Sequence, residues 1–288
     1  MVYFVTSLSI TMPRTSTIAK VGKRKLELSN LNKVLFPADH IIKAELIEYY
    51  LRIAPTILQH IKGRPLSFVR YPDGVDHQPF FQKNRQDWAP DWIEHMSLGN
   101  TDRVDYVLAT EEAALVWTAN LACIEVHQMH CRSPHFDKPD YIVWDIDPPE
   151  GFPFPNVVEM AFELKEEVEK FGYHTFVKTT GGKGVHIVAP IEPRWEFRVA
   201  REAAELVAKG FVEKHSKTAT LAIKKDLRKN RVLIDIYRNS TYQTIVSPYS
   251  VRGRAKAPVS MPLKWDALES ISDPSVFNIH TAADLLLA

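Results

Sequence analysis

Cysteine is scarce in this sequence, and neither sign of charge dominates it. The 288 residues include only two cysteines, Cys123 and Cys131, and the formal net charge is +1. Two cysteines cannot form the disulfide framework of a small secreted domain, so we expect a reducing, cytoplasmic environment. The near-zero net charge excludes a uniformly basic nucleic-acid coat. Any nucleic-acid site must therefore come from local clusters of charge.

Long apolar runs are also missing. No stretch reaches transmembrane length, and residues 1–20 lack a signal-peptide pattern because Ser and Thr interrupt their apolar part. We therefore expect no membrane partner and a flexible N-terminal tail over residues 1–20. The sequence has no internal repeat and no low-complexity linker, while 45% of its residues are hydrophobic. That content suits a sizeable core, in one large domain or two small ones.

The two cysteines lie near histidines, a combination that raises the question of a zinc site. Cys123 and Cys131 are close in sequence to His127, His130 and His135. Their spacing matches no usual zinc-finger pattern. The sequence therefore does not favour zinc.

The predicted helices and strands alternate in a mixed order. Apolar spacing predicts four helices, one kinked or split at Pro55 and one capped by Asn156, over residues 43–61, 111–122, 156–171 and 195–215. Short apolar or alternating runs predict strands at 21–28, 66–70, 79–84, 104–108, 124–127, 141–147, 175–178, 185–189, 231–236 and 242–246. This order indicates an α/β or α+β fold with a mixed sheet.

Three aspartates interrupt strand-like apolar runs. Asp145 and Asp147, in Y-I-V-W-D-I-D-P-P, are two residues apart, so on a strand both side chains point to the same face. Asp235 interrupts a second run, R-V-L-I-D-I-Y. Carboxylates this close repel one another unless a cation lies between them. Hard oxygen ligands of this kind suit Mg2+ or Mn2+.

These aspartates leave more than one interpretation open. Asp145 and Asp147 could lie at a solvated strand end, and Asp235 could form a structural salt bridge with a nearby arginine. Taken together, three carboxylates on strands fit the two-metal arrangement that carries out phosphoryl transfer.

A glycine-rich, basic segment follows a predicted strand. Residues 179–186 read T-T-G-G-K-G-V-H, in which the glycines let the backbone approach a phosphate and Lys183 supplies charge. The spacing is not that of a Walker A loop, and a plain hairpin turn also suits the segment. His186 could be a buried core histidine or a nucleotide contact. Two basic clusters flank Asp235 and could neutralise a triphosphate or a nucleic-acid backbone: Lys224, Lys225, Arg228, Lys229 and Arg231, then Arg252, Arg254 and Lys256.

A doubled aromatic, Phe80-Phe81, precedes the polar and basic residues Q-K-N. Adjacent residues of a strand face opposite ways. We therefore expect one ring in the core and the other exposed for base stacking, with burial of both rings as the alternative.

The joint order of these motifs resembles the polymerase domain of bacterial and archaeal DNA ligase D and its stand-alone relatives, within the archaeo-eukaryotic primase superfamily. The resemblance runs from about residue 28 to residue 268. Eight segments carry it: N-L-N-K-V-L-F-P at 30–37, R-Y-P-D-G-V-D at 70–76, F-F-Q-K-N at 80–84, E-V-H at 125–127, D-I-D at 145–147, T-T-G-G-K-G-V-H at 179–186, D-I-Y-R-N at 235–239 and S-P-Y-S-V-R-G-R at 247–254.

This resemblance implies a primase-like polymerase for non-homologous end joining. Such domains extend or fill DNA ends and gaps on a template, prefer ribonucleotides, and use two Mn2+ or Mg2+ ions with an NTP or dNTP substrate. The implied partners are DNA with 5′-phosphorylated breaks or gaps, and Ku and a DNA ligase as separate chains, at the nucleoid. A metal-dependent nuclease and a non-catalytic module that binds DNA ends and 5′-phosphates remain the alternatives.

The matching motifs also imply a role for each candidate residue. The metals would be held by Asp145, Asp147 and Asp235. The incoming nucleotide would be contacted by His127, Thr180, Lys183, Arg228 and Arg252. The 5′-phosphate of the downstream strand would be bound by Asn30, Lys33 and Lys43. Stacking near the template or the phosphate pocket would come from Phe80 and Phe81.

Two positions depart from the family pattern. Thr180 stands where Ser is common, which keeps a hydroxyl and adds bulk. His77 stands where Gly is common, which leaves the role of its loop open. The implied fold is a primase-type core with an RRM-like mixed sheet and flanking helices over about 136–288, beside a smaller N-terminal αβ part over about 21–135. We expect the two parts to pack as one unit.

Overall fold

A mixed, six-stranded sheet carries the three aspartates in the structure, a computed structural model that describes residues 16–99 and 101–287. We call it the aspartate sheet. Its strand order is β15-β16-β12-β14-β13-β18, with bounds Ala219–Thr220, Val232–Asp235, Tyr141–Asp147, Val185–Pro190, Phe176–Thr179 and Pro262–Leu263. β15 and β16 are parallel, and the other neighbours are antiparallel. The predicted mixed α/β class is therefore confirmed.

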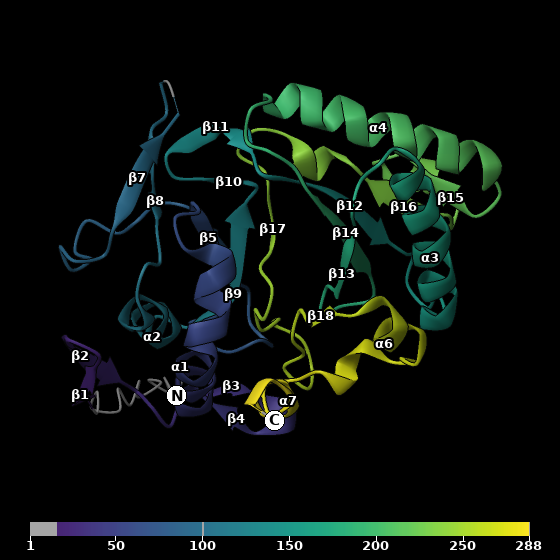
Figure 1. Ribbon diagram of the computed structural model, residues 1–288. Helices are drawn as coiled ribbons and strands as arrows, with labels where there is room; N and C mark the ends of the chain where they lie inside the picture. The colour runs from purple at the N-terminus through teal and green to yellow at the C-terminus, as the bar shows by residue number, and fades with distance from the viewer. Residues whose placement is uncertain (1–15, 100, 288) are drawn as a thin grey trace, which may run out of the picture.

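A second six-stranded sheet, here called the N-terminal sheet, lies beside the first (Figure 1). Its order is β17-β9-β5-β8-β7, with β6 also paired to β5, and the bounds are Thr244–Val246, Cys123–Met129, Leu66–Arg70, Val104–Val107, His95–Leu98 and Phe80–Gln82. Three two-stranded ribbons complete the strands: β1–β2 (Ser16–Val21, Arg24–Ser29), β3–β4 (Val34–Phe36, Ile41–Ile42) and β10–β11 (Cys131–Arg132, His135–Pro139).

Helices cover the outer faces of the two sheets. Their bounds are α1 Lys43–Ile61, α2 Glu112–Asn120, α3 Phe154–Lys170, α4 Phe197–Lys214, α5 Lys225–Arg228, α6 Trp265–Glu269 and α7 Thr281–Leu287. Short 3-10 turns occur at Pro37–Asp39, Tyr237–Asn239 and Pro274–Val276. In the part of the chain that the structure describes, none of the helices is both long and apolar enough to cross a membrane.

The alternation of residues in β12 decides which face of the aspartate sheet is covered. Ile142, Trp144 and Ile146 are buried in one core with residues of α3 and α4. The Trp144 indole nitrogen donates a 3.0 Å hydrogen bond to the Ala204 carbonyl in α4. Because successive strand residues point to opposite faces, the aspartates between these residues point away from α3 and α4.

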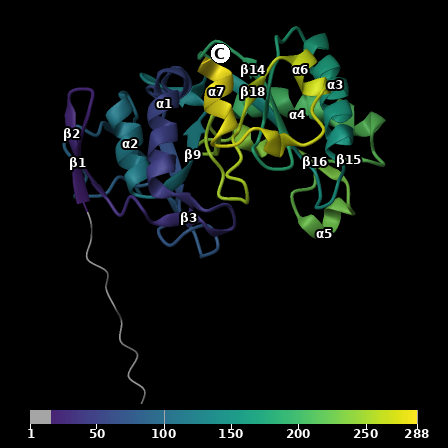
Figure 2. The same cartoon turned by 90° about the horizontal axis from the view of Figure 1, so that it is seen from below.

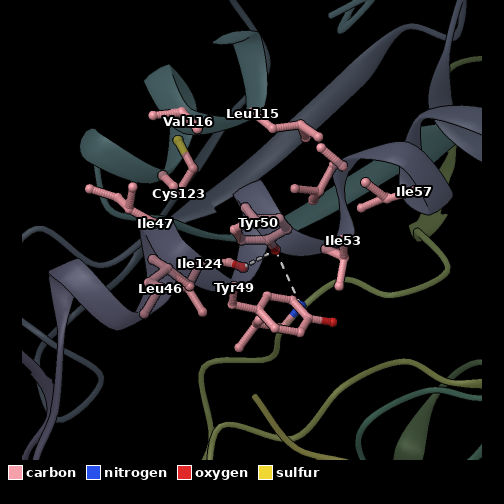
Figure 3. Packing of buried hydrophobic residues seen from close by; sticks show 14 of the residues in the cluster. Leu46, Ile47, Tyr49, Tyr50, Ile53, Ile57, Leu115, Val116, Cys123 and Ile124 are labelled. Carbon is pink, nitrogen blue, oxygen red and sulfur yellow. Dashed lines mark hydrogen bonds between the residues drawn. The ribbon is translucent and has the colours of Figure 1, made fainter. Parts of the chain in front are cut away.

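The second core lies between the N-terminal sheet and α1 and α2, and it includes residues from the C-terminal part of the chain. Figure 3 shows Tyr50 of α1 in this core, with its hydroxyl hydrogen-bonded to the Ile124 carbonyl at 2.7 Å. The Tyr49 hydroxyl donates to the Tyr249 carbonyl at 2.8 Å. Figure 2 shows α7 beside α1, where Arg52 and Asp284 form an ion pair. Residues distant in sequence therefore hold the two halves together.

Several predicted boundaries need correction. α1 continues through Pro55, which is exposed, because Ile53 and Ile57 on either side are buried and anchor both turns. α3 begins at Phe154 after Pro153, so Asn156 lies inside its first turn and does not cap it. α4 begins at Phe197 instead of Trp195, and β17 begins after Tyr242, which has a φ of 63°. The predicted single strand over 21–28 is instead part of a hairpin: β1 begins at Ser16 and ends at Val21, residues 22–23 form the turn, and β2 begins at Arg24.

The predicted N-terminal tail is shortened by this last difference. Residues 16–20 belong to β1, which pairs with β2 in register from Ser16↔Ser29 to Val21↔Arg24. Residues 1–15, the rest of the expected tail, lie outside the described residues.

Candidate active site and phosphate pocket

A row of polar side chains crosses the aspartate sheet at one level. Asp235 on β16 lies directly opposite Asp145 on β12. Asp145 also lies opposite His186 on β14, and His186 pairs with Lys178 on β13. Residues directly opposite in paired strands project from the same face. Since Ile146 points into the core with α3 and α4, the whole row points to the opposite face of the sheet.

Cationic side chains hold the three aspartates. The Arg238 Nε lies 3.2 Å from Asp235 Oδ2 and 3.7 Å from Asp145 Oδ2. Asp147 Oδ2 accepts a 2.9 Å hydrogen bond from Arg228. The salt-bridge interpretation of Asp235 is therefore visible in the structure, with Arg238 as the partner that also reaches Asp145.

The protonation of these carboxylates reflects their crowding. Burial raises the pKa of Asp235 above its ordinary value; Arg238 opposes this effect, and the charges of Asp145 and Asp147 add to it. Burial also opposes ionisation of Asp145, but His186 and Arg238 outweigh it and hold the pKa of Asp145 below its ordinary value. The protein partners therefore favour the ionised form of Asp145 and do not fully offset the cost of ionising Asp235.

The donor chemistry of the cluster fits a hard divalent cation. Carboxylate oxygens are the ligands that Mg2+ and Mn2+ prefer. Across residues 16–99 and 101–287, no three His, Cys, Asp or Glu side chains are already gathered around one metal position. The reason is visible at Arg238, whose guanidinium bridges Asp145 and Asp235. A metal ion suits this position and must compete with that guanidinium.

Asp145 and Asp147 line a cleft of about 200 Å3 together with the glycine-rich turn. Four of the five predicted nucleotide contacts also line it: His127, Thr180, Lys183 and Arg252. The fifth, Arg228, lies at its border through the ion pair with Asp147. The lining also includes Arg254, from the second basic cluster of the sequence analysis, and Arg238, a basic residue that sequence reasoning missed. The cleft thus combines carboxylates with cationic side chains, and Arg238 is both part of its lining and paired with the aspartates.

The hydroxyl of Thr180 organises the glycine-rich turn from inside. Thr180 is buried, and its Oγ1 accepts 3.3 Å hydrogen bonds from the backbone nitrogens of Gly182 and Gly184. The same hydroxyl lies 3.1 Å from the Gly184 carbonyl, to which it donates. The departure from Ser to Thr therefore keeps the group that shapes the turn.

Gly184 is required by the close approach of two strands. A Cβ at this position would collide with the carbonyl oxygen of Ile146, in the strand of the aspartates. We expect Gly184→Ala to lower the free energy of unfolding by about 1–3 kcal/mol, the usual cost of overpacking, and to reduce activity. Urea denaturation measures this change.

The control for this substitution is Gly210→Ala. Gly210 lies in α4, and a Cβ there meets nothing within 4 Å. Alanine is the better helix former by about 0.8–1 kcal/mol, so this variant should be as stable as the wild type or more so. Equal losses in both variants would contradict the steric argument.

Glu125 is a buried carboxylate that sequence reasoning did not assign. Its carboxylate lies 2.9 Å from His127 Nε2 and 3.1 Å from Arg252 Nε, and it accepts a hydrogen bond from the Gly253 backbone. Burial opposes ionisation, but these partners outweigh it and lower the pKa of Glu125 to about 2. Arg252 also donates to the Thr180 carbonyl at 2.8 Å. The E-V-H alternation on β9 was the available signal, because residues two apart share a face.

A second cationic pocket lies on the other side of the N-terminal sheet. Asn30, Lys33 and Lys43 line it, as the resemblance implied. Lys43 is buried, its Nζ donates to the Asn120 carbonyl at 3.0 Å, and burial and the charge of Lys33 lower its pKa to about 8. Lys33 pairs with exposed Asp73 at 3.0 Å. Two lysines held this close make a site for an anion.

Phe80 and Phe81 point toward different pockets. Both rings are about half exposed, so the prediction that one lies in the core is wrong. The Arg70 guanidinium lies 5.0 Å from the centre of the Phe80 ring, and Arg70 lines the second pocket. The Phe81 ring meets His127 of the cleft edge-on, with centroids 5.9 Å apart. In the described sheet β6 pairs only with β5, so its other edge carries no paired strand.

Three other residues of the sequence analysis, His77 and the two cysteines, lie outside both pockets. His77 lies in an exposed turn after Gly74. Cys123 and Cys131 are buried in separate hydrophobic clusters, where burial raises the pKa of each thiol to about 12. These thiols serve as core side chains.

Comparison with known proteins bears on this geometry. The chain is 34% identical over 259 residues to the multifunctional non-homologous end joining protein LigD of Mycolicibacterium smegmatis, covering 89% of this chain and 34% of that protein. It is 28% identical over 261 residues to the bifunctional LigD of Bacillus subtilis, covering 90% of this chain and 42% of that protein. The chain thus spans about a third to two fifths of the length of these relatives.

A solved structure shows the same fold. The polymerase domain of Mycobacterium tuberculosis ligase D, in complex with DNA, matches with a TM-score of 0.84 and 30% identity, over 91% of this chain and 94% of that one. The family model of the LigD primase-polymerase domain matches residues 42–288. These residues include the three aspartates, the glycine-rich turn and Lys43. The chain therefore belongs to the LigD primase-polymerase domain family.

Proposed function

We propose that this protein is a template-directed nucleotidyltransferase that extends DNA ends or fills gaps during non-homologous end joining, with a preference for ribonucleotides. The observation that carries the proposal is the register of Asp145 against Asp235, beside a cleft that also contains cationic side chains. Carboxylates and cations in one cleft suit a metal-bound triphosphate. Family membership supports the same function.

We assign the metals to the three aspartates and the phosphates to cationic side chains of the cleft. Asp145, Asp147 and Asp235 would hold two Mn2+ or Mg2+ ions, which supply activation of the primer 3′-hydroxyl and charge neutralisation at the triphosphate. Lys183 and Arg252 would offset the remaining phosphate charge, because both line the cleft.

The other nucleotide contacts would act in different ways. His127, fixed by Glu125, presents its ring to the cleft. Thr180 would act by holding the backbone of the glycine-rich turn in place. Arg228 would bind the nucleotide from the border of the cleft, next to Asp147.

We assign the second pocket to the 5′-phosphate of the downstream strand. Asn30, Lys33 and Lys43 would bind it, since a phosphate dianion relieves the repulsion between the two lysines. Phe81, which contacts His127, and Phe80, under Arg70, would stack on template bases between the two pockets. One DNA gap would then occupy both pockets at once.

The partners follow from this assignment. We propose DNA with 5′-phosphorylated breaks or gaps as the substrate at the nucleoid, and Ku and a DNA ligase as partner proteins. We also propose that the parts over about 21–135 and 136–288 act as one catalytic unit, because residues 249–283 share the core of the N-terminal part.

Primer extension tests the function against its alternatives. With Mn2+ and a single template base, we expect addition of the matched nucleotide only, and faster addition of the NTP than of the dNTP. Shortening of the DNA without any NTP would indicate a nuclease. Tight DNA binding with neither addition nor shortening, in Mn2+ or Mg2+, would indicate an end-binding module.

Arg238 provides a test of the metal assignment that does not depend on activity. Because its guanidinium bridges Asp145 and Asp235, a metal ion must displace it. We expect Arg238→Gln to bind Mn2+ about fivefold to tenfold more tightly without nucleotide, which corresponds to roughly 1–1.4 kcal/mol. Titration followed by electron paramagnetic resonance measures the affinity.

The matched control is Arg198→Gln. Arg198 is an exposed arginine of α4 that pairs with Glu202, away from the cleft. Its removal should leave Mn2+ affinity unchanged. Unchanged or weaker Mn2+ binding by Arg238→Gln would show that the guanidinium does not compete for the position.

A further inference from the structure

The second pocket is larger than a phosphate group and has a mixed lining. Its volume is about 380 Å3. Part of the lining is cationic and consists of Lys33, Lys43 and Arg70. Another part is largely apolar and consists of Pro72, Trp88, Leu121 and Ala122. A pocket that binds only a phosphate needs the cationic residues, so the apolar residues require another explanation.

Trp88 is the largest of the apolar residues in this lining. Its side chain is 63% exposed. The Trp88 and Trp117 rings meet in a T-shaped arrangement, with centroids 6.1 Å apart and planes at 61°. Trp117 is buried in the N-terminal core. This contact positions the indole, and the exposure leaves most of its surface available to a ligand.

Helix α2 contacts both Trp88 and Lys43. The Trp88 ring contacts Trp117 of this helix, and the carbonyl of Asn120, three residues later, accepts the hydrogen bond from Lys43. Both side chains line the second pocket, so one helix sets the exposed indole and the buried ammonium in the same pocket.

We propose that Trp88 forms a nucleobase subsite beside the phosphate pocket, on which the base of the 5′-terminal nucleotide stacks while its phosphate lies against Lys33 and Lys43. The inference rests on the proposed function and deepens it, since it names the terminal nucleoside as part of the ligand. Base stacking on an aromatic ring tolerates every base, because each base has a π-face. The subsite therefore favours a 5′-phosphorylated end that carries a base, of any identity.

A double-mutant cycle between protein and DNA tests this subsite. The probe is a short gapped duplex whose downstream strand ends in a 5′-phosphate on either a normal nucleotide or an abasic tetrahydrofuran residue. We expect Trp88→Ala to bind the normal end about tenfold more weakly and to bind the abasic end as the wild type does. Trp88→Phe should recover most of the lost affinity.

Three controls separate the possible outcomes. Trp195→Ala removes an exposed tryptophan outside the pocket and should change the affinity for neither the normal nor the abasic end. Circular dichroism checks that each variant is folded. Equal weakening of both ends by Trp88→Ala, or no weakening of either, would overturn the subsite. If Lys43→Gln leaves the preference for a 5′-phosphate intact, the phosphate assignment itself fails, whatever Trp88→Ala does.

Discussion

Asp235→Ala is expected to lower nucleotide addition by at least about 10^3-fold, roughly 4 kcal/mol of transition-state stabilisation. The side chain faces Asp145 across paired strands, so its loss removes an oxygen ligand from the proposed metal site. Binding to a 5′-phosphorylated DNA end should survive, because none of the three aspartates lines the second pocket. Single-turnover extension and fluorescence anisotropy measure the two quantities separately.

The fold should tolerate this substitution. Burial raises the pKa of Asp235, which means that the ionised carboxylate destabilises the folded protein. Asp266→Ala, an exposed residue of α6, is the control and should keep full activity. Wild-type rates in Asp235→Ala would remove this residue from the metal site.

Lys43→Gln is expected to reduce the preference for a 5′-phosphorylated gap by about 10- to 100-fold, in line with roughly 1.5–3 kcal/mol for a hydrogen bond to a charged group. Lys43 is buried at the start of α1, and its Nζ already donates to the Asn120 carbonyl. Affinity for an unphosphorylated gap should change little. The ratio of the two dissociation constants is the measurement.

We also expect the preference for a 5′-phosphate to depend on pH through Lys43. Burial and Lys33 lower the pKa of Lys43 to about 8, so in the free protein the ammonium is charged below that pH and loses its proton above it. The preference of the wild type for a 5′-phosphate should therefore decline between pH 7 and pH 9. Lys62→Gln, an exposed residue after α1, should behave as the wild type. A phosphate preference that is independent of both Lys43 and pH would contradict the assignment.

The local chemistry of the cleft was predictable because strand alternation is a strict rule. D-I-D on an apolar strand places two carboxylates on one face and the isoleucine in the core, as the structure shows for Asp145, Ile146 and Asp147. The glycine-rich turn was likewise placed correctly between β13 and β14. These features depend on residues close together in sequence.

What could not be predicted depends on pairing between distant strands. That Asp235 faces Asp145, and that Arg238 bridges them, follows from the register of β16 against β12. Trp88 and Lys43 line one pocket only because α2 contacts both, through Trp117 and Asn120. Hydrophobic periodicity describes one helix or strand at a time, so it cannot predict such contacts.

Pro55 shows a different limit. Proline removes a helical hydrogen bond, which favours a break, but the buried residues on both sides of it keep α1 continuous over Lys43–Ile61. Tertiary burial thus outweighed a local preference.

The measurement that tests the account most directly is single-nucleotide extension on a gapped duplex with Mn2+ and NTP, with and without a 5′-phosphate on the downstream strand. We predict template-matched addition that the phosphate stimulates, because the aspartate cleft and the Lys33–Lys43 pocket would bind one gap together. Tight binding to the phosphorylated gap with no addition under Mn2+ or Mg2+ would contradict the account and leave the aspartates without their proposed role.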